Sequence, residues 1–343
     1  MDGLCESSRH PMSLPSLIRR FVRCALALWT FLPAPASPVW GDEGPPSWAY
    51  PEKPPDFLPT PDDGSLRRVP GSAASFTLTQ LRDLFRAPDW HPADHAPMPD
   101  VVAYGRRPEV YACGFCHRAE GTGGPENARL AGLPAAYIVQ QMADFKSGAR
   151  GTSVPNRLPT SAMIAVARAA TDTEVAAAAA YFSALAPRRS IRVVETAAVP
   201  KTYVAGWFLA AAPAGAREPI GARILEVPED LERFESRDSR AGFLAYVPIG
   251  SIRQGQVLAE HGGVSAGDQQ TVPCATCHGP GLRGLGPVPG IAGRSPSYVV
   301  RQLWDFRHGA RAGPSSVLMR PVVEKLTLDE MIALAAYLAS LPP

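Results

Sequence analysis

The sequence predicts a mainly α-helical protein with two similar domains in tandem, a Pro-rich extension before the first, and a small β-rich insertion between them. Three observations lead to this prediction. A five-residue pattern, Cys-x-x-Cys-His, occurs twice in the 343 residues, at 113–117 and 274–278. The residues after each copy align with one another and have helical spacing. Residues 188–250 instead carry short runs of β-branched and aromatic residues between Pro and Gly turns.

The two motifs predict covalently attached haem. Their thiols lie about one helical turn apart, so they can add to the two vinyl groups of a haem, and the next His supplies an axial nitrogen. A redox dithiol or half a zinc site needs no His directly after the second Cys. The sequence therefore predicts two haem c groups, attached at Cys113, Cys116, Cys274 and Cys277, with axial His117 and His278.

The two copies align over long stretches. Superposing the motifs without a gap places residues 137–150 on 298–311, where Tyr, Gln, Asp, Phe, Gly, Ala and Arg coincide. A second ungapped block places Met163 on Met319. The offset falls from 161 (298 − 137) to 156 (319 − 163), so the second copy is five residues shorter between the two blocks. A repeat of this length indicates two similar domains.

Composition excludes some classes of function. The net charge is +2, from 34 basic and 32 acidic residues, and no basic cluster suits a phosphate backbone, so we expect no nucleic-acid partner. Two of the six cysteines, Cys5 and Cys24, lie in a predicted leader. The other four belong to the haem motifs, which leaves no thiol for a structural disulfide or for a Cys-ligated catalytic haem.

Residues 1–36 have the features of a secretory signal peptide. A positive region precedes an apolar run, and a cleavage pattern follows: Arg19, Arg20 and Arg23, then residues 24–32, then Ala34 to Ala36. An uncleaved amphipathic anchor is the alternative. The nine-residue apolar run (24 to 32) is too short to span a bilayer. We therefore expect a periplasmic protein that meets a membrane only through its partners.

Residues 37–97 form the Pro-rich extension. Such sequence favours extended backbone, and its aromatic residues, Trp40, Trp48, Tyr50 and Trp90, can pin it onto a domain surface. One helix is expected over residues 77–86. His91 and His95 have a metal-binding spacing, but Pro92 between them favours packing or surface roles.

The two haem domains are expected at 98–187 and 251–343. The first should hold helices over 99–104, from 134 onwards and over 172–185, and the second over 252–261, 297–307 and 327–341. The final helix of each has a capping box, Thr171 with Glu174 and Thr327 with Glu330. In the insertion, 188–250, strands are expected at 191–194, 203–209, 223–227 and 242–247. Docking of a partner protein is an alternative role for the insertion.

Met163 and Met319 are the predicted sixth ligands of the two irons. Both precede the last helix of their copy, and they are the only Met pair that recurs. Met142 is read as core filling because its counterpart is Leu303, and Met331 because its counterpart is Val175. A thioether favours Fe(II) relative to a second imidazole, so it raises the reduction potential.

Four further residues, which are identical at aligned positions of the two copies, are expected near the haems. Tyr137 and Tyr298, with Arg150 and Arg311, can contact haem propionates, because a guanidinium matches a carboxylate with two hydrogen bonds. The alternative is that the aromatic residues belong to the core and the arginines cap helix ends. The residues leave both readings open.

The motifs and the segments after them resemble class I cytochrome c domains, and the tandem is similar to dihaem cytochromes of the c4 type. The resemblance covers residues 98–187 and 251–343. It implies α-helical haem domains, His/Met ligation and periplasmic electron transfer. The extension and the insertion depart from the family pattern. For this chain, the resemblance therefore does not imply the domain packing or the partners that are usual in the family.

The leading functional hypothesis is an electron carrier without catalytic residues, serving a periplasmic dehydrogenase, a quinol-oxidising complex or a terminal oxidase. A dihaem peroxidase is the enzymatic alternative, but it needs an iron with an open site and acid–base groups beside it. A haem-bearing subunit of a periplasmic dehydrogenase complex is the third hypothesis, with the extension and the insertion as its docking surfaces.

Overall fold

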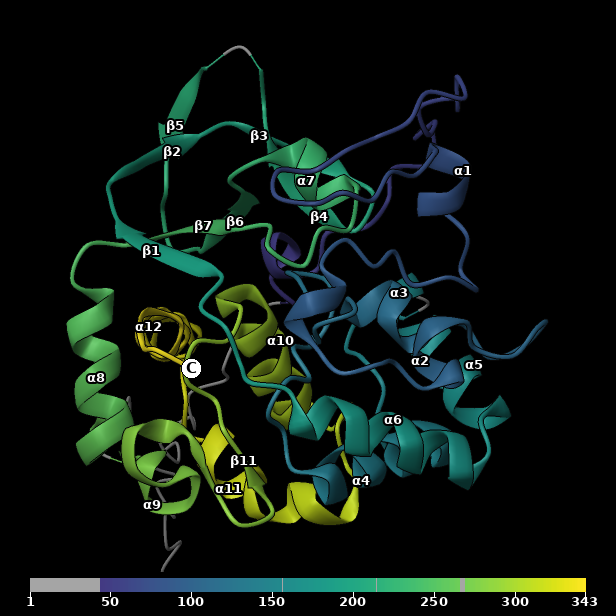
Figure 1. Ribbon diagram of the computed structural model, residues 1–343. Coiled ribbons are helices and arrows are strands. Elements are labelled where there is room, and N and C mark those ends of the chain that lie inside the picture. The colour runs from purple at the N-terminus through teal and green to yellow at the C-terminus, as the bar shows by residue number, and fades with distance from the viewer. Residues whose placement is uncertain (1–43, 156, 214, 266–268) are drawn as a thin grey trace, which may run out of the picture. The chain divides into compact units, whose positions relative to one another are not determined.

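Helices from both copies of the repeat, and strands from the segment between them, build the described part of the chain (Figure 1). This computed structural model describes residues 44–155, 157–213, 215–265 and 269–343. The predicted leader, with Cys5 and Cys24, and Trp40 lie outside these residues. Within the described ranges, no helix has both the length and the apolar character needed to cross a membrane.

The first copy of the repeat contains five helices in the described residues. They are α2 (Asp100–Ala103), α3 (Cys113–His117), α4 (Ala135–Ser147), α5 (Leu158–Ala169) and α6 (Asp172–Ala184). Thr171 and Glu174 form the predicted capping box at the start of α6. Helix α5 was not predicted. Val102, Val110 and Phe182 are almost fully buried in the core that these helices share.

The second copy begins with an 11-residue helix and ends with a 13-residue helix. Its helices are α8 (Ser251–His261), α9 (Ala275–His278), α10 (Pro296–Arg307), α11 (Arg320–Val323) and α12 (Leu328–Ser340), with 3-10 turns η3 (Pro280–Leu282) and η4 (Pro314–Leu318). Two short ribbons pair β8 (Val264–Ser265) with β9 (Gln269–Gln270) and β10 (Gly284–Leu285) with β11 (Val288–Pro289). The capping box of Thr327 and Glu330 is confirmed. Helix α12 is buried along most of its length because α8, α10 and strand β1 (Ile191–Glu195) pack against it.

Strands fill much of the segment between the copies. A three-stranded sheet has the order β1-β7-β6, in which β7 (Phe243–Val247) runs parallel to β1 and antiparallel to β6 (Leu225–Pro228). Further pairs join β2 (Ala198–Pro200) to β5 (Arg217–Pro219) and β3 (Thr202–Ala205) to β4 (Phe208–Ala211). The single strand expected over 203–209 is wrong, because Gly206, at φ 76°, turns the chain into a β3–β4 hairpin.

The described part of the Pro-rich extension has little regular structure. It contains η1 (Ser47–Ala49), α1 (Leu78–Leu81) and η2 (Pro92–Asp94). The helix expected over 77–86 is too long. Asp83 accepts a hydrogen bond from the backbone N–H of Phe85, and the Leu84 carbonyl accepts one from Ala112 (2.9 Å), so the chain turns away after α1.

Two aromatic side chains pin the extension, as predicted. Tyr50 is buried, and its hydroxyl donates to Asp305 (2.9 Å) on α10. Trp90 is 2% exposed, and its indole N–H donates to the Ser236 carbonyl (2.7 Å), just after α7 (Leu231–Glu235). The extension therefore contacts both the second copy and the insertion.

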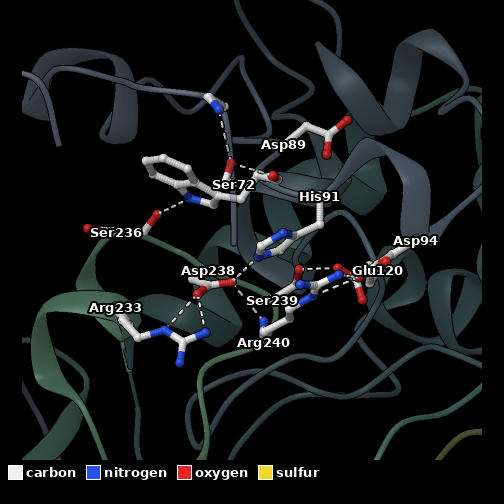
Figure 2. A network of polar contacts seen from close by, with 12 residues as sticks. Ser72, Asp89, His91, Asp94, Glu120, Arg233, Ser236, Asp238, Ser239 and Arg240 are labelled. Carbon is white, nitrogen blue, oxygen red and sulfur yellow. Dashed lines mark hydrogen bonds and ion pairs between the residues drawn. The ribbon is translucent and has the colours of Figure 1, made fainter. Parts of the chain in front are cut away.

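A buried polar network around Asp238 joins the extension to the insertion (Figure 2). The Asp238 carboxylate accepts from the Arg233 guanidinium (2.6 and 2.8 Å) and lies 3.0 Å from His91 Nε2. His91 and Asp238 are both almost fully buried. Next to it, Ser239 donates to Glu120, which lies three residues after His117. Through Ser239, the polar contacts of the insertion therefore reach the chain just after the first motif.

The crossing of α8 and α12 offers a test of the packing. A Cβ on Gly255 of α8 would lie 1.9 Å from the Ala333 carbonyl oxygen of α12. We expect Gly255→Ala to lower the free energy of unfolding by about 1–3 kcal/mol, because the helices must separate. The measurement is denaturant unfolding of the haem-loaded protein.

Gln256→Ala is the matched control, because Gln256 is the exposed neighbour on the same helix. Its effect should stay within about 0.5 kcal/mol. Equal stability of Gly255→Ala and the wild type would contradict the close approach.

Candidate haem sites

The two motif histidines have the same hydrogen-bonded environment. His117 Nδ1 lies 2.8 Å from the Ala128 carbonyl oxygen, and His278 Nδ1 lies 2.8 Å from that of Pro289. Each acceptor is 11 residues after its His. A carbonyl oxygen only accepts, so Nδ1 carries the proton and Nε2 keeps the lone pair that can bind iron.

Burial keeps both histidines neutral. They are about nine-tenths buried, and burial lowers the pKa of both His117 and His278. Neutral imidazole is the form that binds a metal ion. Sequence reasoning missed the two carbonyl acceptors, because every residue has a backbone carbonyl.

A cavity of about 580 Å³ opens beside the first motif. This volume is within the range of about 300–1,000 Å³ usual for cofactor sites. Cys113, Cys116 and His117 lie on one wall, and the surroundings are mostly apolar, with Leu133, Ile138, Phe145, Val166 and Phe182 among them. The cavity suits a flat apolar cofactor held at the motif.

The extension and the insertion add walls to this cavity. Leu84 comes from the extension, and Trp207 and Arg237 come from the insertion. The Arg237 guanidinium stacks 3.6 Å from the centroid of the Phe115 ring and donates to the Phe115 carbonyl (3.0 Å). The first motif is therefore covered by segments from outside its own copy.

The second motif is more open. Cys277 is exposed, whereas Cys274 is partly buried against the core around α12. Burial raises the pKa of Cys274 to about 11 and that of Cys113 to about 12, so neither free thiol ionises readily at neutral pH. The two similar motifs thus lie in different surroundings.

The predicted methionine ligands lie in different local structures. Met163 is in the middle of α5 and lines the first cavity. Met319 lies between η4 and α11 and packs against the core that also contacts Cys274. Met142, on α4, lines the first cavity as well. The geometry therefore places two thioethers at the first site.

The coinciding arginines and tyrosines meet where the two copies touch. Arg150 donates to the Tyr298 hydroxyl (3.1 Å) and to Gln302 (2.9 Å) of the other copy, and to Gln141 (2.7 Å) of its own. Arg311 mirrors this, with hydrogen bonds to the Tyr137 hydroxyl (3.4 Å), to Gln141 (2.7 Å) and to Gln302 (3.0 Å). The structure thus places the four predicted residues together, in a crossed network between the copies.

This network is rich in positive charge. Burial alone would raise the pKa of Tyr137, but Arg311, Arg150 and Arg294 beside it outweigh burial and lower the pKa. Tyr137, Tyr298 and Arg150 also line the first cavity. The interface and the first site are therefore continuous.

His91 and His95 contact different acidic side chains. His91 pairs with Asp238 and His95 with Asp89, so their side chains take separate partners. No group of three or more metal-binding side chains occurs in the ranges that the structure describes. The packing role favoured for the pair agrees with these contacts.

Comparison with known proteins gives relatives over most of the chain. A thiosulfate dehydrogenase electron acceptor from Thiomonas intermedia is 29% identical over 240 residues, covering 68% of this chain and 81% of the relative. A cytochrome c4 from Stutzerimonas stutzeri is 30% identical over 246 residues, covering 68% of this chain and 86% of the relative. No protein-family model matches the sequence.

Among solved structures, a thiosulfate dehydrogenase from Marichromatium purpuratum aligns with 30% identity and a TM-score of 0.45. The alignment covers 68% of this chain and 37% of the other.

An experiment can show which of the two thioethers at the first site binds iron. We expect Met163→Leu and Met319→Leu each to remove about half of the weak near-infrared sulfur-to-iron absorption of the oxidised protein, because each variant removes one thioether ligand. Met142→Leu should leave the band unchanged.

Met142→Leu is the matched control, since it removes the other thioether of the same cavity and installs the residue found at its repeat counterpart, Leu303. Loss of the band in Met142→Leu with retention in Met163→Leu would reverse the assignment at the first site.

Proposed function

The chain belongs to the dihaem class I cytochrome c family, and on that premise we propose that it is a periplasmic carrier of electrons between redox proteins. The observation that carries the proposal is the pair of neutral histidines, each with Nδ1 held 2.8 Å from a backbone carbonyl and each following two cysteines. This donor set fits haem c at both motifs. A structural dithiol would not need an oriented imidazole.

The proposed domains follow the predicted boundaries: a signal peptide at 1–36, the Pro-rich extension at 37–97, cytochrome c domains at 98–187 and 251–343, and the β-rich insertion at 188–250. The contact of Tyr50 in the extension with Asp305, and that of Arg237 in the insertion with Phe115, support the view that both added segments dock on the cytochrome domains.

In this proposal each motif fixes a haem through its two thiols and presents imidazole Nε2 to the iron. A bound haem supplies a one-electron couple at each site. The carbonyls of Ala128 and Pro289 hold the imidazole rings in one tautomer and orientation. Met163 and Met319 are the proposed sixth ligands, and the apolar walls around Ile138 and Phe182 exclude water from the first site.

The proposed electron donor is a periplasmic dehydrogenase. Support comes from the relative from Thiomonas intermedia, whose name describes an electron acceptor of thiosulfate dehydrogenase. A quinol-oxidising complex is the alternative donor, and a terminal oxidase is the proposed final acceptor. Copurification with a catalytic subunit would instead indicate that the protein is a haem-bearing subunit of a dehydrogenase complex.

The first test is spectroscopic. Protein recovered from the periplasm of a host that attaches haem c should carry two haems per chain and bind no carbon monoxide, because a carrier needs six-coordinate iron. Carbon monoxide binding by about one haem per chain would contradict the carrier and favour the peroxidase hypothesis.

Each methionine should control the potential of its own haem. We expect Met163→His to lower the potential of one haem and Met319→His that of the other, because imidazole favours Fe(III) more than a thioether does. A redox titration followed by visible absorption makes the measurement. Two unshifted waves in both variants would overturn the ligand assignment.

A further inference from the structure

Arg157 is a buried guanidinium that forms no ion pair with the residues that the structure describes. It stands at the N-terminus of α5, six residues before Met163, and is 4% exposed. Its Nε and Nη2 find no hydrogen-bond partner among the described residues. The side chain lines the first cavity. A buried cation in this state is costly, so the position calls for an acceptor that the described residues do not supply.

The neighbouring acidic groups do not meet this need. The Asp305 carboxylate is bound by the hydroxyls of Tyr50 and Ser153, and Glu126 attracts the guanidinium without a hydrogen bond to it. Burial, and after it the nearby Arg301, lowers the pKa of Arg157 to about 9, against a weaker opposing effect of Glu126. The guanidinium remains mostly charged at neutral pH.

The other arginines of the cavity are already engaged. Arg150 is held by Gln141, Tyr298 and Gln302 in the crossed network. Arg301 donates to the carbonyls of Ala49 and Pro125. Arg157 therefore has hydrogen-bonding capacity free within the cavity, and its planar group can bind a carboxylate through two parallel N–H donors.

The second copy has no equivalent. Arg150 and Met163 are 13 residues apart (163 − 150), whereas Arg311 and Met319 are 8 apart (319 − 311). The residues between Arg311 and Met319 include no Lys or Arg. The first copy is thus five residues longer between its arginine and its methionine, and this longer stretch contains Arg157.

We propose that Arg157 forms a carboxylate-binding subsite of the first cavity, which takes a propionate of the first haem and raises the reduction potential of that haem alone. The inference rests on the proposed function. A nearby positive charge destabilises the ferric form, which has one more positive charge than the ferrous form, so the cation favours reduction. Arg157 is a positioning residue, because it acts on the iron through the propionate and through its charge.

The test is a redox titration of Arg157→Gln in the haem-loaded protein. We expect the equilibrium constant for reduction of the first haem to fall about tenfold, which is about 59 mV for a one-electron couple. The wave of the second haem should stay in place. Met163→His identifies the wave of the first haem, because the two variants should move the same wave.

Arg168→Gln is the matched control, since Arg168 is the exposed arginine on the same helix. It should leave both waves unshifted. If Arg157→Gln does not load two haems, Arg157→Leu gives the same test with an apolar stem in place. Unshifted waves, equal shifts of both waves, or an equal shift in Arg168→Gln would overturn the proposal.

Haem content and the near-infrared band, measured on the same samples, separate this inference from the proposed function. Absence of two His/Met haems in the wild type would overturn the proposed function. Two intact haems with unshifted waves in Arg157→Gln would overturn only the role of Arg157.

Discussion

The crossed hydrogen bonds of Arg150 and Arg311 are the interaction on which the arrangement of the two copies depends. Each guanidinium binds the glutamine of its own copy and the tyrosine and glutamine of the other, so neither copy satisfies its interface alone. Backbone hydrogen bonds beside the pair, from Gly151 to Ala310 (2.6 Å) and from Ala312 to Ala149 (2.7 Å), fix the register. The two motifs are thereby held in one geometry, which a transfer path between two cofactors requires.

The added segments make two similar sites unequal. Glu226, on strand β6 of the insertion, accepts from Ser295 (2.7 Å) at the start of α10, so the insertion is tied to the second copy as well as to the first motif. The extension and the insertion cover the first motif through Leu84 and Arg237, whereas Cys277 of the second is exposed. Burial lowers the local dielectric and strengthens charge effects on a buried couple. The difference in burial between the two motifs is thus a physical reason for the two haems to have different reduction potentials.

The sequence predicted what depends on local pattern. The capping boxes at Thr171 and Thr327 are present because Ser or Thr followed by Glu three residues later satisfies helix N–H groups without tertiary help. The strand expected over 203–209 failed because the turn at Gly206 outweighs β propensity, and the helix expected over 77–86 ends early because Leu84 pairs with Ala112, far along the chain. At the sites, residue types indicated the motif ligands. The carbonyls of Ala128 and Pro289 were missed because every residue has a carbonyl, and only folding selects one.

Buried positive charge connects the fold to its cofactor. Burial is the largest effect on Arg129 and Arg157, and it lowers the pKa of each to about 9. Arg129 donates through its two terminal nitrogens to the carbonyls of Gly293 and Ala292 in the other copy, but these carbonyls do not neutralise its charge, and its Nε has no partner among the described residues. Burying positive charge at an interface has an electrostatic cost. Carboxylates can offset this cost, and each haem carries two carboxylates. Anything that binds the folded state alone stabilises it, so attachment of the cofactors should favour the docking of the two copies. With the proposed haems bound, docking of the two copies and haem attachment are then coupled, because haem carboxylates offset the cost of the buried arginine charge at the interface.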